Sequence, residues 1–581
     1  MKIKLAQTSG FCMGVRRAME LTLEALNRRQ GPIYSYGPLI HNAQVLEMLK
    51  NKGLTILELG TDSLNGIAGG TVIIRAHGLP PNEVKILEDV GLSIIDATCP
   101  RVIRVQAIIR KQSEMGYTPI IVGDANHPEV IGLMGHSNGK GRAVKTKEDV
   151  EALADFDKVV VVAQTTQSQK LFEEVVEAVK ARWPAALIFT TICGATHRRQ
   201  EEVRRLSEQV QAMVVVGGHN SGNTARLAEV SRSQGLKTVH LEAEDELDPE
   251  WLSDVDTVGV TAGASTPNWM IKRVVRELER IASRRELSLR SVSHRLLRIM
   301  LLSNIYVALG ASALCMAGAF LQGLSFSFEL IAVTFFYVHA MHMLNLFLDK
   351  EAGKYNDPDR VLFLESHKTV LIGSGILSGL VCLALGLKIS FSIFILFVGT
   401  SAVSLLYSVN LIPGFLRPYL RITKLKDIPA SRTLSVSGGW ALSLSLIPVL
   451  AFGEALTWST AIVAAIIFLL VFIRSSLGGI FDIQGDRIVG QETVPIIIGE
   501  ERTLSLLNLA VALLALALAG GWLLSFLSSL ALFLLVLPAY ATFYLILHKR
   551  ERLVIGTFFE ALVDVNFLLS GLVAWLWMVL R

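Results

Sequence analysis

The chain has 581 residues, of which 51% are hydrophobic, and its 55 Lys and Arg residues nearly balance 51 Asp and Glu residues. The charges are unevenly distributed, because residues 1–298 hold 38 basic and 35 acidic residues, whereas residues 299–581 hold only 17 and 16. This division excludes a purely soluble enzyme, a disordered chain and a disulfide-rich scaffold, and the net charge of +4 is too small to indicate nucleic-acid binding.

The first half of the chain alternates short β-branched runs with amphipathic helical stretches, such as those at 172–182 and 200–211. Strand candidates lie at 71–75, 119–122, 159–163, 213–216 and 257–260. Alternation of strand and helix predicts an α/β fold with parallel sheets. We therefore expect one domain over residues 1–282.

Three cysteines of this half share a common setting. Cys12, Cys99 and Cys193 are 87 and 94 residues apart, and each follows an extended stretch and precedes a helical one. The spacing predicts three modules, each offering one cysteine from a strand-to-helix loop. Three thiolates are one fewer than usually ligate a [4Fe–4S] cluster, which leaves one iron open to a substrate. The alternative is three buried, inert cysteines, since free cysteine is often buried.

Several strand-to-helix loops are rich in hydroxyl, amide and imidazole groups. They lie at 75–78, 127–129, 164–168, 219–224 and 262–265. Such groups beside the N–H groups of a helix start form a site for phosphate. The N-terminal sequence lacks the apolar core and cleavage site of a signal peptide, so we expect this half to stay in the cytosol, where thiols remain reduced.

Seven short motifs make a family resemblance specific. They are SGFCMGV at 9–15, GPLIHN at 37–42, RAHG at 75–78, DATCP at 96–100, HPE at 127–129, TIC at 191–193 and GAS at 263–265. In this order they resemble the 4-hydroxy-3-methylbut-2-enyl diphosphate reductase family, also called LytB. The resemblance implies three αβα modules around a central [4Fe–4S] cluster held by Cys12, Cys99 and Cys193. The substrate contacts that it implies are His41, His77, His127, Thr165, Ser221, Asn223 and Ser265.

The same resemblance implies the reaction, a reductive loss of the substrate's hydroxyl group that yields isopentenyl and dimethylallyl diphosphate. Glu129 matches the family's proton donor, with Thr165 as a relay. Gly222 falls where some members have a second serine, so we expect backbone to replace one hydroxyl contact. Because no G-x-G-x-x-G fingerprint for a nicotinamide or flavin occurs in this half, we expect an external electron donor such as a ferredoxin or a flavodoxin.

A basic linker over 283–298 leads into the second half, where apolar runs predict about nine membrane-spanning helices over 299–581. The runs lie at 299–322, 327–348, 368–387, 389–409, 432–452, 457–477, 503–522, 525–547 and 555–580. Fifteen Lys and Arg residues fall in the alternate connections 349–368, 410–432, 474–502 and 548–552. By the positive-inside rule these connections face the cytoplasm, on the side of the first half. We therefore expect a multi-pass protein of the inner (cytoplasmic) membrane.

Two acidic clusters lie at the cytoplasmic ends of predicted spans. Asn345 and Asp349 end the second span, and Asp482 and Asp486 lie four residues apart after the sixth. Residues at this spacing share one face of a helix, and carboxylates suit a Mg²⁺ ion that carries a diphosphate. The sequence therefore predicts a Mg²⁺ and prenyl diphosphate site.

The second half resembles the UbiA superfamily of intramembrane prenyltransferases. The resemblance is carried by the Asp482 and Asp486 pair and by ETVP at 492–495. The first acidic motif departs from the usual pattern, because Leu346 and Gly353 occupy two acidic positions, for which Asp357 or Asp359 is a candidate replacement. The resemblance implies Mg²⁺-assisted transfer of a prenyl group to a lipophilic acceptor.

The leading interpretation is a bifunctional isoprenoid enzyme that binds small-molecule diphosphates and a lipid bilayer, and no nucleic acid. Two alternatives stay open from the sequence. In one, the same reductase is held by a non-catalytic membrane anchor. In the other, a membrane transporter carries an iron–sulfur regulatory domain.

Overall fold

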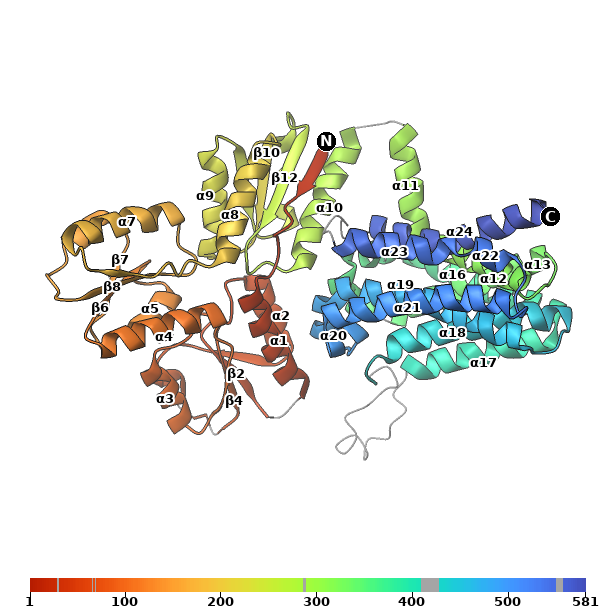
Figure 1. Cartoon of the computed structure of the whole chain (residues 1–581), viewed down its shortest axis with the longest axis horizontal. Coiled ribbons are helices and arrows are strands. Elements are labelled where there is room, and N and C mark those ends of the chain that lie inside the picture. Colours follow the sequence, from red (N-terminus) through yellow and green to blue (C-terminus); the bar gives the residue numbers. More distant parts are fainter. Residues whose placement is uncertain are drawn as a thin grey trace. The chain divides into compact units, whose positions relative to one another are not determined.

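A computed structural model describes residues 1–28, 31–64, 66–67, 69–285, 289–348, 350–408, 428–549 and 557–580. The chain forms two compact units, Met1–Arg285 and Glu286–Arg581 (Figure 1). The N-terminal unit is α/β and the C-terminal unit is helical in its described residues, which confirms the predicted fold classes. The finer limits 1–282, 283–298 and 299–581 remain predictions.

The N-terminal unit contains three sheets of four strands each, and every strand pairing in them is parallel. In spatial order, the first sheet has β1 (Lys2–Leu5), β12 (Thr257–Ala262), β10 (Ala212–Val216) and β11 (Lys237–Leu241). The second has β3 (Leu54–Leu57), β2 (Ile33–Tyr36), β4 (Thr71–Ile74) and β5 (Ser93–Asp96). The third has β7 (Arg142–Val144), β6 (Thr118–Val122), β8 (Val159–Ala163) and β9 (Leu187–Ile188).

Ten helices surround these sheets. They are α1 (Met13–Arg28), α2 (Ala43–Asn51), α3 (Pro81–Asp89), α4 (Pro100–Glu114), α5 (Pro128–Gly135), α6 (Lys147–Glu151), α7 (Gln169–Arg182), α8 (Gly194–Ser207), α9 (Gly222–Ser233) and α10 (Asn268–Arg285). The predicted strands are confirmed, and β8 and β10 are buried along their whole length, as expected of strands covered by helices on both faces. The helix predicted over 200–211 begins and ends earlier, as α8 (Gly194–Ser207). The prediction missed its start because the first turns of α8 are polar and show no apolar period.

The helices that follow the cysteines join one sheet to the next. After β5 leaves the second sheet, α4 packs Val102, Val105 and Ile109 against the third sheet. After β9 leaves the third sheet, α8 packs Val203 and Leu206 against the first. The three predicted modules are therefore interlocked, and the cysteines lie where the chain crosses between sheets.

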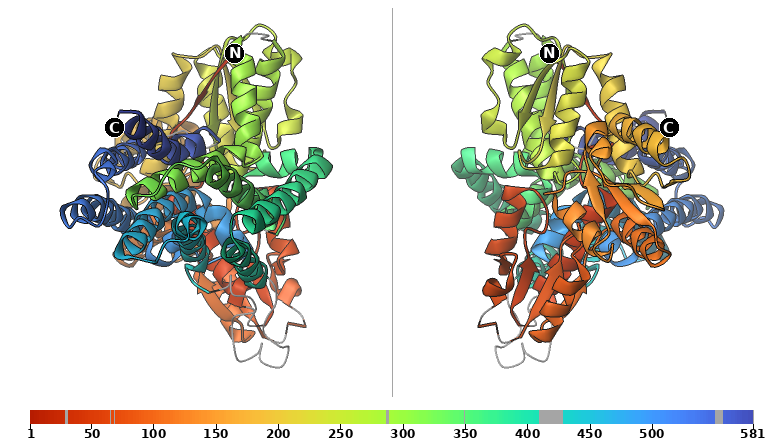
Figure 2. Two further views of the ribbon diagram at one scale, coloured as in Figure 1. Left: turned by 90° about the vertical axis from the view of Figure 1, so that its right-hand side faces the viewer. Right: turned by 90° about the vertical axis from the view of Figure 1, so that its left-hand side faces the viewer.

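The described part of the C-terminal unit consists of helices, most of them long and apolar, and Figure 2 shows the ribbon from two further sides. They are α11 (Leu289–Leu302), α12 (Ile305–Leu321), α13 (Phe328–Leu348), α14 (Lys350–Asn356), α15 (Pro358–Ser366), α16 (Lys368–Ile389), α17 (Phe391–Ser408), α18 (Ser431–Phe452), α19 (Trp458–Val489), α20 (Val494–Ile498), α21 (Glu500–Leu523), α22 (Leu530–Phe533), α23 (Val536–Lys549) and α24 (Thr557–Leu580).

All nine predicted segments contain helix, but the described residues give seven to eight spans against the nine predicted. Seven helices are long and apolar enough to cross a membrane, or eight if the helix pair α11 and α12, which bends by 74°, counts as one span. The segment predicted over 389–409 is α17, a shorter apolar helix. The chain is therefore a multi-pass membrane protein. The helix predicted over 457–477 continues as α19 to Val489, so its polar end carries Asp482 and Asp486.

A charged pair lies inside this apolar unit. Arg474, midway along α19, binds Asp564 of α24 through two hydrogen bonds, one of them from Nη2 to Oδ2 at 3.1 Å. Asp564 is only 3% exposed in its side chain. Removing one partner would leave the other charge buried and uncompensated, whereas removing both would not.

We expect Arg474→Met to destabilise the membrane unit by about 3–5 kcal/mol, the usual cost of breaking a buried ion pair. The double variant Arg474→Met with Asp564→Leu should recover most of this loss. Thermal unfolding of the full chain in detergent measures both. Equal losses in the single and double variants would contradict a paired role.

Candidate active sites

The three sheets of the N-terminal unit have the same strand arrangement, except that one edge strand of the first sheet, β1, comes from the start of the chain. In each, the chain passes from a central strand to the strand on one side and then crosses back to the other central strand. The order therefore reverses between β2 and β4, between β6 and β8, and between β10 and β12. Parallel sheets bind ligands beyond the carboxyl ends of strands at such a reversal.

The residues predicted to contact substrate follow these six central strands. His41 follows β2, His77 follows β4, His127 and Glu129 follow β6, Thr165 follows β8, Ser221, Gly222 and Asn223 follow β10, and Ser265 follows β12. Each sheet thus contributes two loops from its point of reversal.

The cysteines follow the edge strands instead, and each is tied to a central loop of the same sheet. The Cys12 N–H donates to the carbonyl of Ala264 at 3.1 Å, and the Cys99 N–H donates to that of Ala76 at 3.0 Å. The Cys193 N–H donates to the carbonyl of Thr165 at 2.8 Å. Backbone hydrogen bonds therefore fix each cysteine against a loop that carries a predicted substrate residue.

Each cysteine also lies at the start of a helix. Cys12 directly precedes α1, and Cys99 and Cys193 are the N-cap residues of α4 and α8. All three are free and partly buried. Burial raises the pKa of the Cys99 thiol, and the N–H groups of Arg101 and Val102 oppose this shift. Three helix N-termini stabilise negative charge on the sulfur atoms.

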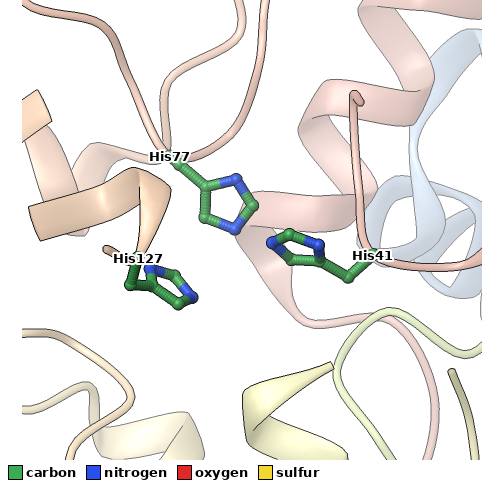
Figure 3. Close-up of side chains that lie close together, drawn as sticks. All are labelled: His41, His77 and His127. Carbon is green, nitrogen blue, oxygen red and sulfur yellow. The ribbon is translucent and has the colours of Figure 1, made fainter. Parts of the chain in front are cut away.

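Three histidines from two different sheets face one another (Figure 3). The ring centroids of His41 and His77 are 4.8 Å apart, and His127 lies 5.8 Å from His41 and 5.5 Å from His77. One ring nitrogen from each lies within 4.8 Å of the others, a spacing that would also suit a metal ion. The structure therefore gathers nitrogen donors that are 86 residues apart in the sequence, from 41 to 127.

These imidazoles are neutral at neutral pH. Removal from water lowers the pKa of His127 to about 4, and it lowers the pKa of His77 well below its usual value. Burial, followed by the nearby Arg75 charge, lowers the pKa of His41. Within the described part of the chain, His41 Nε2 and His77 Nδ1 are buried and make no hydrogen bond. Buried nitrogen atoms without a hydrogen-bond partner are suited to bind a polar ligand.

Glu129 is a buried carboxyl group that is held in place by one residue. It is 2% exposed, and it accepts hydrogen bonds from the Thr165 N–H at 2.6 Å and from the Thr165 hydroxyl at 2.9 Å. Burial raises the pKa of Glu129 to about 7, although both hydrogen bonds oppose the shift. The group is therefore protonated at mildly acidic pH and can give up its proton near neutrality.

The first sheet contributes the hydroxyl and amide side of the site. The Ser265 hydroxyl donates to the His41 carbonyl at 3.1 Å and to the Ser221 hydroxyl at 3.5 Å. Asn223 Nδ2 is buried with no hydrogen-bond partner among the described residues. A Cβ atom on Gly222 would meet nothing within 4 Å, so the position has room for a side chain.

Sequence reasoning missed several buried polar residues around these loops. Asn42 caps α2 and donates to the Ser265 carbonyl at 3.2 Å, and Arg75 is 3% exposed beside the histidines. Arg199 and Glu202 of α8 bind the loop before Cys12. The motifs at 37–42 and 75–78 contain the first two, but only the folded chain shows which of their side chains turn inward.

The membrane unit joins its second acidic cluster to α14, the helix that follows the first cluster. Asp486 is fully buried, and its Oδ1 accepts hydrogen bonds from Asn356 at 2.7 Å and from Arg432 at 3.3 Å. A Cβ atom on Gly485 would lie 1.8 Å from Asn356 Oδ1, so this close approach of α14 to α19 requires glycine. Neither Asn356 nor Arg432 was among the predicted site residues.

The structure gives less information on the other predicted residues of the membrane site. Asn345 Oδ1 accepts a hydrogen bond from Ser404 at 3.4 Å, and Asp482 is partly buried on α19. Asp349 lies outside the described residues. Of the two candidate replacements, Asp357 caps α15 and pairs with Arg360, and Asp359 pairs with Arg298. Both carboxylates are thus paired with arginine residues.

Comparisons with known proteins divide the chain at the same place. Residues 3–279 match the family described as LytB protein, and residues 295–570 match the UbiA prenyltransferase family. A 4-hydroxy-3-methylbut-2-enyl diphosphate reductase of Aquifex aeolicus (strain VF5) is 43% identical over 282 residues, which cover 48% of this chain and 96% of that protein.

Two solved structures are similar to the two halves. One is the (E)-4-hydroxy-3-methyl-but-2-enyl diphosphate reductase, described as the terminal enzyme of the non-mevalonate pathway, with 41% identity, 48% of this chain and 100% of that chain covered, and a TM-score of 0.39. The other is a UbiA homolog from Archaeoglobus fulgidus bound to DMAPP and Mg²⁺, with 16% identity, 48% and 98% covered, and a TM-score of 0.35. Because 43% identity extends over 96% of the Aquifex reductase, the chain belongs to the LytB family, and its second half is a UbiA prenyltransferase family domain.

Proposed function

We propose that the N-terminal unit reduces 4-hydroxy-3-methylbut-2-enyl diphosphate to isopentenyl and dimethylallyl diphosphate. The observation that carries the proposal is the set of three backbone hydrogen bonds that tie Cys12, Cys99 and Cys193 to the loops beside Ser265, His77 and Thr165. This arrangement would hold a redox centre and a diphosphate at one place. It supports the reductase activity named for the Aquifex relative.

The donor set fits a [4Fe–4S] cluster. Cys12, Cys99 and Cys193 supply three free thiols at helix N-termini, which favour a cluster of net negative charge. A Cβ atom on Gly14 would lie 2.5 Å from Cys99 Sγ, so glycine there lets α1 approach the second cysteine. When bound, the cluster would supply electrons and one iron site without a protein ligand.

The protein's own residues would bind the substrate and move protons. His41 and His77 would offer the diphosphate buried ring nitrogens that have no hydrogen-bond partner within the described structure. Asn223 would offer a side-chain amide nitrogen in the same state. Glu129 would deliver a proton towards the hydroxyl group through the Thr165 hydroxyl, which lies 2.9 Å from its carboxylate. Electrons would come from an external donor such as a ferredoxin or a flavodoxin.

The membrane unit would transfer a prenyl group from its diphosphate to a lipophilic acceptor. Asp482 and Asp486, with Asn345 and Asp349 of the first motif, would hold Mg²⁺, which neutralises the diphosphate as it leaves. In support, Asn356 of α14, the helix that follows the first acidic cluster, contacts Asp486 of the second. The positive connections would face the cytoplasm, with the reductase unit on that side of the inner membrane.

A cysteine series tests the reductase proposal. We expect Cys12→Ser, Cys99→Ser and Cys193→Ser each to lose most of the iron bound per chain, together with reductase turnover, because each removes one of three protein ligands. Iron content and substrate reduction are measured on the full chain in detergent.

The chain offers matched controls for this series in Cys315 and Cys382, which are 1% and 3% exposed in the membrane unit. Cys315→Ser and Cys382→Ser should retain iron and turnover. Full iron binding in all three N-terminal variants would refute the cluster.

A further inference from the structure

One buried arginine connects the segments that carry two of the cysteines. Arg199 is 5% exposed and follows Cys193 by six residues on α8. Its Nη2 donates to the Gly10 carbonyl at 2.6 Å, two residues before Cys12. Within the described structure its Nε is buried and makes no hydrogen bond, so the guanidinium group is removed from water but not fully satisfied.

The next turn of α8 holds the same loop through a carboxylate. Glu202 accepts hydrogen bonds from the Gln7 N–H at 2.6 Å and from the Thr8 N–H at 2.9 Å, and it also binds the Thr8 hydroxyl. Residues three apart lie on one face of a helix, so Arg199 and Glu202 form a two-point clamp. The clamp connects the helix that starts at Cys193 to the loop that ends at Cys12.

Arg199 also carries a positive charge, which acts in addition to the hydrogen bonds of the clamp. The hydrogen bond to the Gly10 carbonyl holds the guanidinium group at the loop that leads to Cys12, and Cys12 and Cys193 exert the largest electrostatic effects on the pKa of Arg199 after burial. Reduction adds one negative charge to a cluster on these ligands. A fixed positive charge in a poorly solvated setting stabilises the more negative state, and net charge is one of the properties that set the potential of such clusters.

We propose that Arg199 is a positioning residue that fixes the Cys12 loop and raises the reduction potential of the cluster. The inference rests on the proposed function, since it requires a cluster on Cys12, Cys99 and Cys193. No atom of Arg199 takes part in the chemistry of the substrate. Its contribution is to make the reduced state accessible to the external donor.

The test is a redox titration of the full chain in detergent, with iron per chain measured on the same samples. We expect Arg199→Gln to retain iron and to lower the reduced-to-oxidised ratio at a fixed potential at least tenfold, which is about 59 mV for a one-electron couple. Arg199→Lys keeps the charge but not the planar guanidinium contact with Gly10, so its potential should stay close to that of the parent chain.

The adjacent Arg198 provides a matched control, because it is exposed and one residue away on the same helix. Arg198→Gln removes the same charge from solvent and should leave the potential unchanged. An unchanged potential in Arg199→Gln with iron retained would overturn the proposal.

If Arg199→Gln does not fold or loses iron, Arg199→Lys decides. A fall in its potential as large as tenfold in the reduced fraction would overturn the charge argument. Absence of iron in the parent chain would instead refute the cluster itself.

Discussion

Replacing Glu129 with glutamine is expected to reduce kcat/KM of the reductase by about 100-fold or more, the usual range for loss of a general acid. Glutamine preserves the size of the side chain, and its amide oxygen can still accept the Thr165 N–H. The glutamine amide, however, has no acidic proton to donate. The loss should therefore appear in turnover, with iron content and substrate affinity retained.

The pH profile provides a second view of the same group. Because burial raises the pKa of Glu129 to about 7, the carboxyl group keeps its proton below that pH and loses it above. We expect kcat/KM to fall about tenfold per pH unit above pH 7, since this quantity reports the ionisation of the free enzyme. His127, with its pKa lowered to about 4, should stay neutral across this range.

Asp124 is the control for this prediction, because it is an exposed carboxylate in the same loop, five residues earlier. Asp124→Asn should preserve both the rate and the alkaline limb of the profile. If Glu129→Gln kept the alkaline limb of the parent chain, another group would be the proton donor.

The sequence predicted the α/β fold because five of the six central strands lie in runs rich in β-branched residues; the sixth, β2 (IYSY), is not such a run and was missed. It could not predict the interlocking of the modules. β1 carries only four residues and pairs with β12, some 250 positions away, and no local pattern encodes that register. The assignment of cysteines to edge strands depends on the same long-range pairing, so it too is visible only in the folded chain.

Site residues divide along a similar line. Polar motifs identified His41, His77 and His127 as candidates, since imidazoles in strand-to-helix loops are a chemical signal. Arg199 and Glu202 gave no such signal, because α8 is rich in charged residues and most of them are solvated. Which charged side chain of a helix is buried depends on what covers it, and that is a property of the tertiary structure.

The membrane half shows what apolar runs can and cannot predict. Their length and composition identified the spans, since spanning a bilayer takes about 20 apolar residues. They could not show where the sixth helix ends, because α19 continues as a polar segment after the apolar run. That extension keeps Asp482 and Asp486 on one helix, as their spacing of four predicted, and it allows Asn356 of α14 to contact Asp486.

Asp482 tests the proposed prenyltransferase site of the membrane unit. We expect Asp482→Asn to reduce Mg²⁺-dependent release of diphosphate from prenyl diphosphates by about 100-fold or more, which corresponds to about 3 kcal/mol of lost transition-state stabilisation. Asp482 is the better of the two motif residues to change. Asp486 is fully buried and bound by Asn356 and Arg432, so its loss would also disturb packing.

Two controls separate catalysis from folding in this experiment. Glu454→Gln changes an exposed carboxylate in the short connection between α18 and α19, at the other end of α19 from Asp482, and should leave diphosphate release unchanged. Reductase turnover of the same Asp482→Asn preparation should equal that of the parent chain, because the changed residue belongs to the other compact unit. Undiminished, Mg²⁺-dependent release from Asp482→Asn would exclude this carboxylate as a metal ligand. If the parent chain released no diphosphate while its reductase was active, the membrane unit would only anchor the enzyme. The structural reason would be the incomplete first acidic motif, because Asp357 and Asp359 are already paired with arginine.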